Sequence, residues 1–349
     1  MDKRQWTFES VKQYYGKILK SSKDLQTNAC CTEDALPVYT RQAFELLHPE
    51  VKNKFFGCGS PIPTLLQGCR VLDLGCGSGR DCYLLSYLVG ELGEVIGVDM
   101  TPEQLGIANT YIDYHTQKFG YKKPNIKFIE GYIEDLESAK ILSNSVDLVV
   151  SNCVINLSPD KKRVFSEILR VLKPGGELLF SDVFSSRRVP QLIADDPILL
   201  GECLGGALYI EDFRRLLFSL KIPDYRVVSS RPIAMGNSNT SKEIKNIDFY
   251  SMTIRLFKLE GLEDRCEDYG QVAYYLGNIP ESSSGFLLDD HHFFEKKRPV
   301  LVCNNTARML QETRYGKYFR VEGDLKNHYG LFPCDPIIKK ETQEFGGCC

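Results

Sequence analysis

Three glycines at alternate positions follow a short apolar segment, and this turn constrains the fold more than any other stretch: Gly75, Gly77 and Gly79. The apolar segment, residues 70–74, predicts a buried strand with one acidic residue, Asp73, and residues 80–89 predict a helix. Glycine tolerates positive φ and has no Cβ, so the backbone can turn sharply and approach a ligand closely. Because the turn leads to free N–H groups at a helix N-terminus, the stretch predicts a cofactor-binding loop.

Residues after Cys69 alternate between strand and helix patterns, which predicts an α/β fold with a doubly wound, mostly parallel sheet. The expected strands are residues 70–74, 94–98, 126–130, 146–151 and 177–182. The expected helices are residues 80–89, 101–119 and 161–172, and a turn is expected at residues 173–176.

We expect four segments along the chain. Residues 1–67 would form an N-terminal cap of helices and loops, and residues 68–182 the cofactor-binding domain. Residues 183–260 lose the regular alternation and would form a domain for the acceptor. Residues 261–349 would form a small C-terminal domain with a tail that ends in Cys348 and Cys349.

Charge and hydropathy argue against several classes of function. The formal net charge of −3 and the pI near 6.0 give no reason to expect a nucleic-acid-binding surface. No apolar run approaches the roughly 20 residues that a membrane span needs. No apolar segment of the kind found in secretory signals follows the N-terminus. We therefore expect a monomeric protein of the cytoplasm.

The 13 cysteines are the unusual feature of the composition. Without a secretory signal they indicate thiol chemistry or soft-metal binding, and not a disulfide framework. No zinc-type pair of CxxC motifs is present, and adjacent cysteines cannot easily ligate one ion in a closed tetrahedron. A structural zinc site is therefore not expected.

The glycine spacing distinguishes between cofactors. A dinucleotide fingerprint has the spacing GxGxxG, whereas here Asp73 precedes glycines with the spacing GxGxG, which disfavours a dehydrogenase. S-adenosylmethionine has no phosphates, but it carries an ammonium, a carboxylate, a sulfonium and an adenosine. Asp73 can supply the carboxylate that the ammonium needs, and loop N–H groups can bind the ligand's carboxylate. S-adenosylmethionine is therefore the predicted cofactor.

Residues at the ends of later strands extend this prediction. Asp99 can accept hydrogen bonds from both ribose hydroxyls, and Met100 can pack on the adenine. Ile133 and Glu134 offer an apolar wall and an acceptor for the adenine edge, and Asn152 would lie beneath the sulfonium. The alternatives are that Asp99 caps the next helix and that Ile133 belongs to the core. The predicted cofactor residues are Asp73, Gly75, Cys76, Gly77, Gly79, Asp99, Met100, Gln104, Ile133, Glu134 and Asn152.

These motifs, together with LKPGG at residues 172–176, resemble the class I S-adenosylmethionine-dependent methyltransferases over residues 69–182. In that fold the residue after the fourth strand faces the departing methyl group, and here it is Cys153. Cys203, Cys58 and Cys30 also lie in predicted loops, where packing does not need them. For any free cysteine the alternative is a buried small hydrophobe. Thiolates select soft centres, and trivalent arsenic binds three of them, so the loop cysteines predict one shared soft ligand.

The chain resembles one methyltransferase family in particular, the arsenite methyltransferases, over about residues 10–260. The matching segments are SKDLQT at 22–27, GCG at 57–59, GCGSGRDCY at 75–83, SNCVINL at 151–157 and GECLGGALY at 201–209. The C-terminal domain matches more loosely. Family members usually have a tyrosine at the position of Phe56, so this chain lacks that hydroxyl.

The resemblance implies a catalytic cycle. Arsenite or its glutathione adduct, and methylarsenite in later rounds, would bind to Cys58, Cys153 and Cys203, and the arsenic lone pair would attack the methyl carbon. No general base is needed, and alignment would provide most of the rate enhancement. The product is pentavalent, and a cysteine pair that includes Cys30 with Cys58 would return two electrons by forming a disulfide. Thioredoxin or glutathione would then reduce that disulfide. Cys31, beside Cys30, could take the same redox part.

Two other functions stay open from the sequence. A methyltransferase for a carbon, oxygen or nitrogen acceptor would need a base near the methyl group. His115 is expected on an exposed helix, while His291 and His292 lie in the C-terminal domain, so no histidine meets that need. A metalloid-binding sensor or buffer without turnover would need neither the glycine turn nor Asp99. Binding of S-adenosylmethionine would therefore argue against a sensor or buffer.

Overall fold

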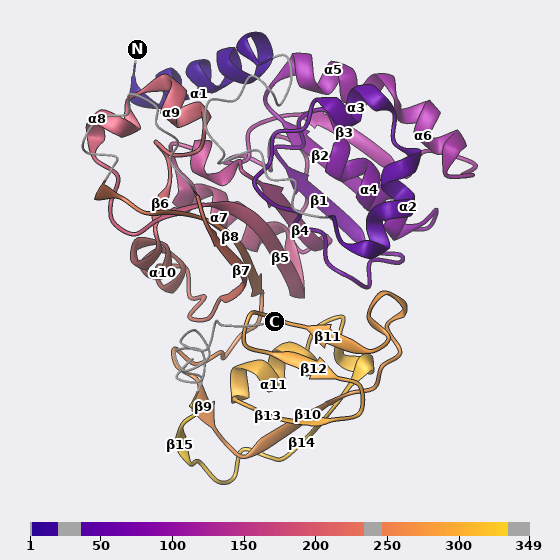
Figure 1. The fold of residues 1–349 in the computed structure, drawn as a ribbon, viewed down its shortest axis with the longest axis vertical. Coiled ribbons are helices and arrows are strands. Elements are labelled where there is room, and N and C mark those ends of the chain that lie inside the picture. Colours follow the sequence, from indigo (N-terminus) through magenta and orange to yellow (C-terminus); the bar gives the residue numbers. More distant parts are fainter. Residues whose placement is uncertain (1, 20–35, 234–245, 334–349) are drawn as a thin grey trace, which may run out of the picture. The chain divides into compact units, whose positions relative to one another are not determined.

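The computed structural model describes residues 2–19, 36–233 and 246–333 (Figure 1). The chain divides into two compact units, Met1–Lys258 and Leu259–Cys349. The cysteines outside the described residues are Cys30, Cys31, Cys334, Cys348 and Cys349. Within the described residues no helix is long and apolar enough to span a bilayer.

The first unit is built on one eight-stranded sheet in the order β3-β2-β1-β4-β5-β8-β7, with β6 paired to β5. Its strands are β1 (Arg70–Leu74), β2 (Glu94–Asp99), β3 (Ile126–Glu130), β4 (Val146–Asn152), β5 (Leu172–Ser185), β6 (Leu208–Tyr209), β7 (Arg226–Pro232) and β8 (Phe249–Phe257). The pairs β3–β2, β2–β1, β1–β4, β4–β5 and β5–β6 are parallel. Strand β8 is antiparallel to both β5 and β7. The predicted mostly parallel α/β sheet is therefore confirmed.

Helices cover both faces of this sheet (Figure 1). The helices of this unit are α1 (Lys3–Gln13), the π-helical η1 (Tyr14–Ile18), α2 (Arg41–Leu46), α3 (Pro49–Asn53), α4 (Arg80–Val89), α5 (Pro102–Thr110), α6 (Ile112–Lys118), α7 (Lys161–Val171), α8 (Gln191–Ala194), α9 (Pro197–Gly201) and α10 (Ile210–Ser219). Leu72 and Leu74 of β1 share an apolar cluster with α7 and α10, whereas Val71 shares one with α2 and α4. Side chains alternate between faces along a strand, so β1 contributes to two cores.

Two local predictions differ from the structure. The helix predicted over residues 101–119 is interrupted at Tyr111, whose φ of −104° and ψ of 12° are not helical. The turn predicted at residues 173–176 lies within β5, because Gly175 donates from N to the Lys258 oxygen at 2.8 Å and Gly176 accepts from Lys258 N at 2.9 Å. These bonds continue the pairing of β5 with the chain that follows β8.

The second unit has small antiparallel sheets and one described α-helix. Its elements are β9 (Glu267–Asp268), β10 (Gln271–Tyr275), β11 (Gly285–Leu287), β12 (Phe293–Glu295), β13 (Pro299–Val302), α11 (Asn304–Gln311), β14 (Phe319–Glu322) and β15 (Gly330–Leu331). Tyr275, Phe286 and Phe319 pack against one another, with ring centroids 5.1–6.0 Å apart.

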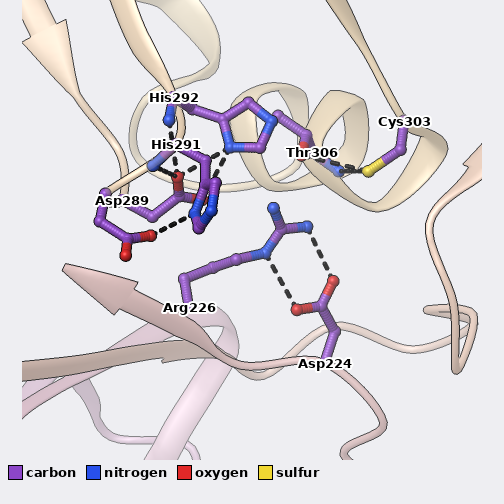
Figure 2. A network of polar contacts seen from close by, with 8 residues as sticks. Asp224, Arg226, Asp289, His291, His292, Cys303 and Thr306 are labelled. Carbon is purple, nitrogen blue, oxygen red and sulfur yellow. Dashed lines mark hydrogen bonds and ion pairs between the residues drawn. The ribbon is translucent and has the colours of Figure 1, made fainter. Parts of the chain in front are cut away.

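Polar side chains organise the turn before β12. Asp289 accepts backbone hydrogen bonds from His291 and His292, at 2.9 and 2.7 Å, and it also pairs with the His292 ring (Figure 2). Cys303 is the N-cap residue of α11, and its sulfur lies 3.3 Å from the hydroxyl of Thr306 (Figure 2). Both histidines thus lie in the second unit, as the sequence predicted.

Candidate active site

A cavity opens at the carboxyl ends of β1, β2, β3 and β4, with about 920 Å³ of space including its open mouth. This edge is where open α/β sheets bind ligands. The predicted cofactor residues that line it are Asp73, Gly75, Cys76, Gly77, Asp99, Met100, Gln104, Ile133, Glu134 and Asn152. Gly79 instead caps the N-terminus of α4.

The glycine turn is fixed by the strand beside it. Gly75 donates from N to the Val98 oxygen at 2.7 Å, and its φ is +71°. A Cβ at this position would lie 2.3 Å from the Val154 side chain, so only glycine fits. Gly77 donates from N to Asp99 Oδ2 at 2.9 Å, which links the turn to the end of β2.

Asp99 also accepts a hydrogen bond at the start of the next helix. Its second carboxylate oxygen, Oδ1, accepts from Thr101 N at 2.8 Å, at the start of α5. The capping alternative therefore has structural support, although the same carboxylate also lines the cavity. Glu134 accepts from the hydroxyl of Ser158, and burial raises the pKa of its carboxyl group. Ile133 is 8% exposed and lines the cavity from within the core cluster.

Two buried groups at the cavity suit a cationic, hydrogen-bonding ligand. Burial, together with the nearby charge of Asp81, raises the pKa of Asp73 to about 8, and Cys82 donates from Sγ to Asp73 Oδ2 at 3.1 Å. Gln104 donates from Nε2 to the Tyr15 oxygen, while its Oε1 is buried without a hydrogen-bond partner among the described residues. An ammonium beside Asp73 and a donor beside Gln104 would satisfy both groups. The residues present therefore fit S-adenosylmethionine.

The N-terminal helix covers one side of the cavity, which the sequence did not predict beyond a general cap. Phe8, Val11 and Tyr15 line the cavity, and the Phe8 ring lies 4.8 Å from that of Tyr132. Tyr15 donates its hydroxyl hydrogen to the Gly201 oxygen at 2.7 Å. In Figure 1, α1 lies beside α9, although the two are far apart in sequence. A sequence signal for this role is the helical spacing of Val11, Tyr14 and Tyr15.

Three predicted arsenic-binding cysteines lie together, and one of them, Cys153, lines the cavity. Cys58 and Cys153 form a disulfide with Cα atoms 5.9 Å apart, and Cys203 donates from Sγ to the Cys153 oxygen at 3.2 Å. All three side chains are 1% exposed or less. Cys153 and Cys203 have φ values of +57° and +63°, a conformation that non-glycine residues rarely adopt. Such outliers concentrate at functional sites.

The structure contains a disulfide that was not predicted, between Cys58 and Cys153. The resemblance implies a redox pair of Cys30 with Cys58, and Cys30 lies outside the described residues. The reason for the Cys58–Cys153 pairing is local, because Asn152 Oδ1 accepts from Cys58 N at 3.1 Å and so holds Cys58 beside the end of β4. A Cβ at Gly59 would lie 2.4 Å from Ser181 Oγ, so this approach also requires the glycine.

Two charged residues near the thiols escaped the sequence analysis. A carboxylate oxygen of Asp182 and the sulfurs of Cys153 and Cys203 lie within 4.8 Å of one another, and burial raises the pKa of Asp182 to about 7. Lys161 donates from Nζ to the Ser158 oxygen at 3.0 Å, and burial lowers its pKa to about 8. Asp182 lies near the end of the fifth strand, in a position like that of Asp99 on the second strand. This position is the sequence signal that could have identified Asp182 as a site residue.

His115 is not exposed, contrary to the prediction. Its side chain is 1% exposed, and its ring stacks on Tyr83 with centroids 3.6 Å apart. Its Nε2 accepts from His48 N at 3.2 Å, and its Nδ1 lies 2.7 Å from the Tyr111 oxygen. Burial lowers the pKa of His115 to about 4, so the ring is neutral and part of the core.

Comparison with known proteins assigns the family. A family model described as a methyltransferase domain matches residues 65–222. The arsenite methyltransferase of Aquipseudomonas alcaligenes is 51% identical over 324 residues, which cover 93% of this chain and 93% of that protein. The chain belongs to the arsenite methyltransferase family. It is therefore an S-adenosylmethionine-dependent methyltransferase, as the sequence predicted.

Two further members of the family agree with this assignment. The arsenite methyltransferase of Mus musculus is 44% identical over 314 residues, 89% of this chain and 82% of that protein. The crystal structure of an arsenic(III) S-adenosylmethionine methyltransferase from Chlamydomonas reinhardtii matches with a TM-score of 0.82 and 51% identity, over 85% of this chain and 100% of that one. The predicted class I methyltransferase fold is confirmed.

Proposed function

We propose that this protein transfers methyl groups to trivalent arsenic held by the thiolates of Cys58, Cys153 and Cys203. The observation that carries the proposal is the convergence of these three buried cysteines beside the cavity that the cofactor residues line. They come from three separate loops, and residues 183–260 would supply the acceptor side through Cys203. The names of the relatives support arsenite as the substrate.

Arsenic binding requires the reduced protein. Two electrons and two protons convert the Cys58–Cys153 disulfide to two thiols, and a dithiol or glutathione can supply them by thiol–disulfide exchange. Arsenous acid then exchanges its three hydroxyl groups for three cysteine sulfurs, with release of three molecules of water. The arsenic lone pair stays free, so the chain needs no general base.

The cavity residues hold and orient the methyl donor. When bound, S-adenosylmethionine supplies an electrophilic methyl group on a sulfonium. Asp73 would hold its ammonium, Asp99 its ribose, and Met100 with Ile133 its adenine, while the Gln104 oxygen would accept a further hydrogen bond. The tightly packed thiols keep arsenic at one place, so the chain contributes alignment above all.

The redox step would use the same thiols. Methylation leaves pentavalent arsenic, and two electrons return it to the trivalent state. Oxidation of Cys58 and Cys153 to their disulfide supplies those electrons, and Cys30 is proposed as the thiol that next exchanges with it. Thioredoxin or glutathione would complete the reduction. This chemistry suits the reducing cytoplasm, and a monomer provides every residue that it uses.

The test is incubation of the purified chain with arsenite, glutathione, thioredoxin and S-adenosylmethionine, followed by chromatography and mass spectrometry of the arsenic species. Methylated products are expected from the wild type and from C266S, a control in the second unit. C153S and C203S should lose methylation while they keep affinity for S-adenosylhomocysteine. Full activity of either serine variant would exclude the thiolate site.

A further inference from the structure

We propose that Asn152 and Asp81 couple the methyl-donor site to Cys58, so that each ligand strengthens binding of the other. This inference rests on the proposed function for the identity of the two ligands. Asn152, Asp81 and Arg80 all line the cavity, and Asn152 directly precedes Cys153. They connect the glycine turn to the loop that carries Cys58.

The Asn152 amide is bonded on both of its ends. Its Oδ1 accepts from Cys58 N at 3.1 Å and from Gly59 N at 3.2 Å. Its Nδ2 donates to the Gly59 oxygen at 2.8 Å and to Asp81 Oδ2 at 3.0 Å. One side chain therefore holds both the Cys58 loop and a carboxylate of α4.

Asp81 fixes which way this amide points. It lies in the first turn of α4, and its other oxygen accepts from Arg80 Nε at 2.9 Å and from Nη2 at 2.8 Å. Both side chains of this ion pair are at most 11% exposed. A carboxylate can only accept, so it must face the amide NH₂ group, and the amide oxygen is left to face the N–H groups of Cys58 and Gly59.

The same loop has a second attachment to α4 and an independent one to the sheet. Arg80 Cζ lies 3.0 Å above the ring centroid of Phe55, three residues before Cys58. On the other side, the Cys58 oxygen accepts from Ser251 Oγ at 2.8 Å and from Arg231 Nη2 at 3.3 Å. Of these attachments, those of Asn152 and Arg80 lead to the glycine turn, and those of Ser251 and Arg231 lead to the sheet.

The consequence is a thermodynamic link between two ligands. A donor bound at the turn orders Asp73 and the first turn of α4, and this ordering extends through Asp81 and Asn152 to Cys58. Because these residues are then already ordered, arsenic binds at Cys58 with a smaller loss of conformational entropy. By thermodynamic reciprocity, bound arsenic strengthens binding of the donor by the same factor. Asn152 is thus a positioning residue for the acceptor thiol.

The coupling is measured by calorimetry on the reduced protein. S-adenosylhomocysteine is titrated with and without arsenite, and arsenite with and without S-adenosylhomocysteine. In the wild type each ligand should tighten the other by roughly tenfold, within the usual range for coupled sites. In N152A and N152D the factor should fall below about twofold. In D81N/N152D, the exchanged pair can again form one amide–carboxylate bond, so the coupling should partly return.

Two further measurements separate coupling from general destabilisation. S251A removes one of the two attachments of the Cys58 oxygen to the sheet, so it should weaken arsenite binding but keep the coupling factor. Alkylation of the reduced protein by iodoacetamide, followed by mass spectrometry, should show faster labelling of Cys58 in N152A and unchanged labelling of Cys203. If N152A fails to fold, the isosteric D81N carries the test.

The outcomes are distinct. Full coupling in N152A, or in D81N where N152A does not fold, would overturn the inference. Binding of both ligands to the wild type without coupling would also overturn it, and would leave the proposed function intact. Absence of arsenite binding to the reduced wild type, with S-adenosylhomocysteine still bound, would refute the proposed function itself.

Discussion

The hydroxyl of Tyr14 donates a 2.6 Å hydrogen bond to the carboxylate of Glu202, which is fully buried and lies 188 residues further along the chain. Glu202 directly precedes Cys203, so this bond ties the N-terminal helix to the acceptor thiol. Y14F should lower the free energy of unfolding by about 1–3 kcal/mol, because it removes a donor from a buried carboxyl group. Urea denaturation measures the loss. Y15F removes a part-buried hydrogen bond to the Gly201 oxygen and should cost about 1 kcal/mol. Equal losses in both variants would contradict the greater cost expected at the buried carboxyl group.

The buried ring of His115 makes stability depend on pH. Its pKa is lowered to about 4, whereas the unfolded chain has the ordinary value near 6.5. Between these pKa values the unfolded state binds more protons than the folded state. The folded protein is therefore fully stable above pH 6.5 with respect to this group, and it loses stability as the pH falls towards 4. Lowering the pH from 7.5 to 5 should cost about 2 kcal/mol from this group alone. Urea denaturation at both pH values should show a smaller difference in H115Q, and an identical difference would refute the assignment.

Asp73 predicts that cofactor affinity depends on pH. Because its pKa is raised to about 8, the carboxyl group is mostly protonated at pH 7 in the free protein, and it must ionise to hold an ammonium. The affinity for S-adenosylhomocysteine should therefore increase up to roughly tenfold per pH unit between pH 6 and 8. Calorimetry in buffers with different ionisation enthalpies should detect about one released proton at pH 7. D73N should bind S-adenosylhomocysteine weakly and should lose the pH dependence that Asp73 causes. The ligand's own titration affects both proteins equally, so the difference between them reports Asp73.

The left-handed backbone at Cys153 predicts that the stability of the protein depends on the shape of the side chain at this position. A β-branched residue is strained at a φ of +57°, whereas serine tolerates it better. Under reducing conditions, C153T should be less stable than C153S by about 1–3 kcal/mol. Cys69 has no positive φ, so C69T and C69S provide the matched comparison and should differ less. Equal differences at the two positions would refute the strain.

The sequence predicted those parts of the fold that depend on local patterns. Residues 70–74 and 80–89 agree with β1 and α4, because a buried apolar strand, a glycine turn and a helix start each have a local signature. His115 and Asp182 were misjudged or missed because their environments come from distant segments. The ring of Tyr83 covers His115, and the sulfurs near Asp182 arrive from two other loops.

The candidate site shows the same division. Every predicted cofactor residue except Gly79 lines the cavity, since strand ends of a parallel sheet meet at one edge. The pairing of Cys58 with Cys153 was not predicted, because it depends on Asn152 folding a loop from 94 residues earlier onto the end of β4. Side-chain hydrogen bonds of this kind leave no periodic trace in the sequence.

In the oxidised protein, Cys58 and Cys153 are bonded to each other and cannot bind a metalloid. Under the proposed function, the substrate and the disulfide therefore compete for the same two atoms, and occupancy of one state excludes the other. Arsenic would protect the enzyme against oxidation, and an exhausted electron supply would stop it with its pocket still formed. The rate at which the cell delivers reducing equivalents, and not the supply of methyl groups alone, would then limit how fast arsenic is processed.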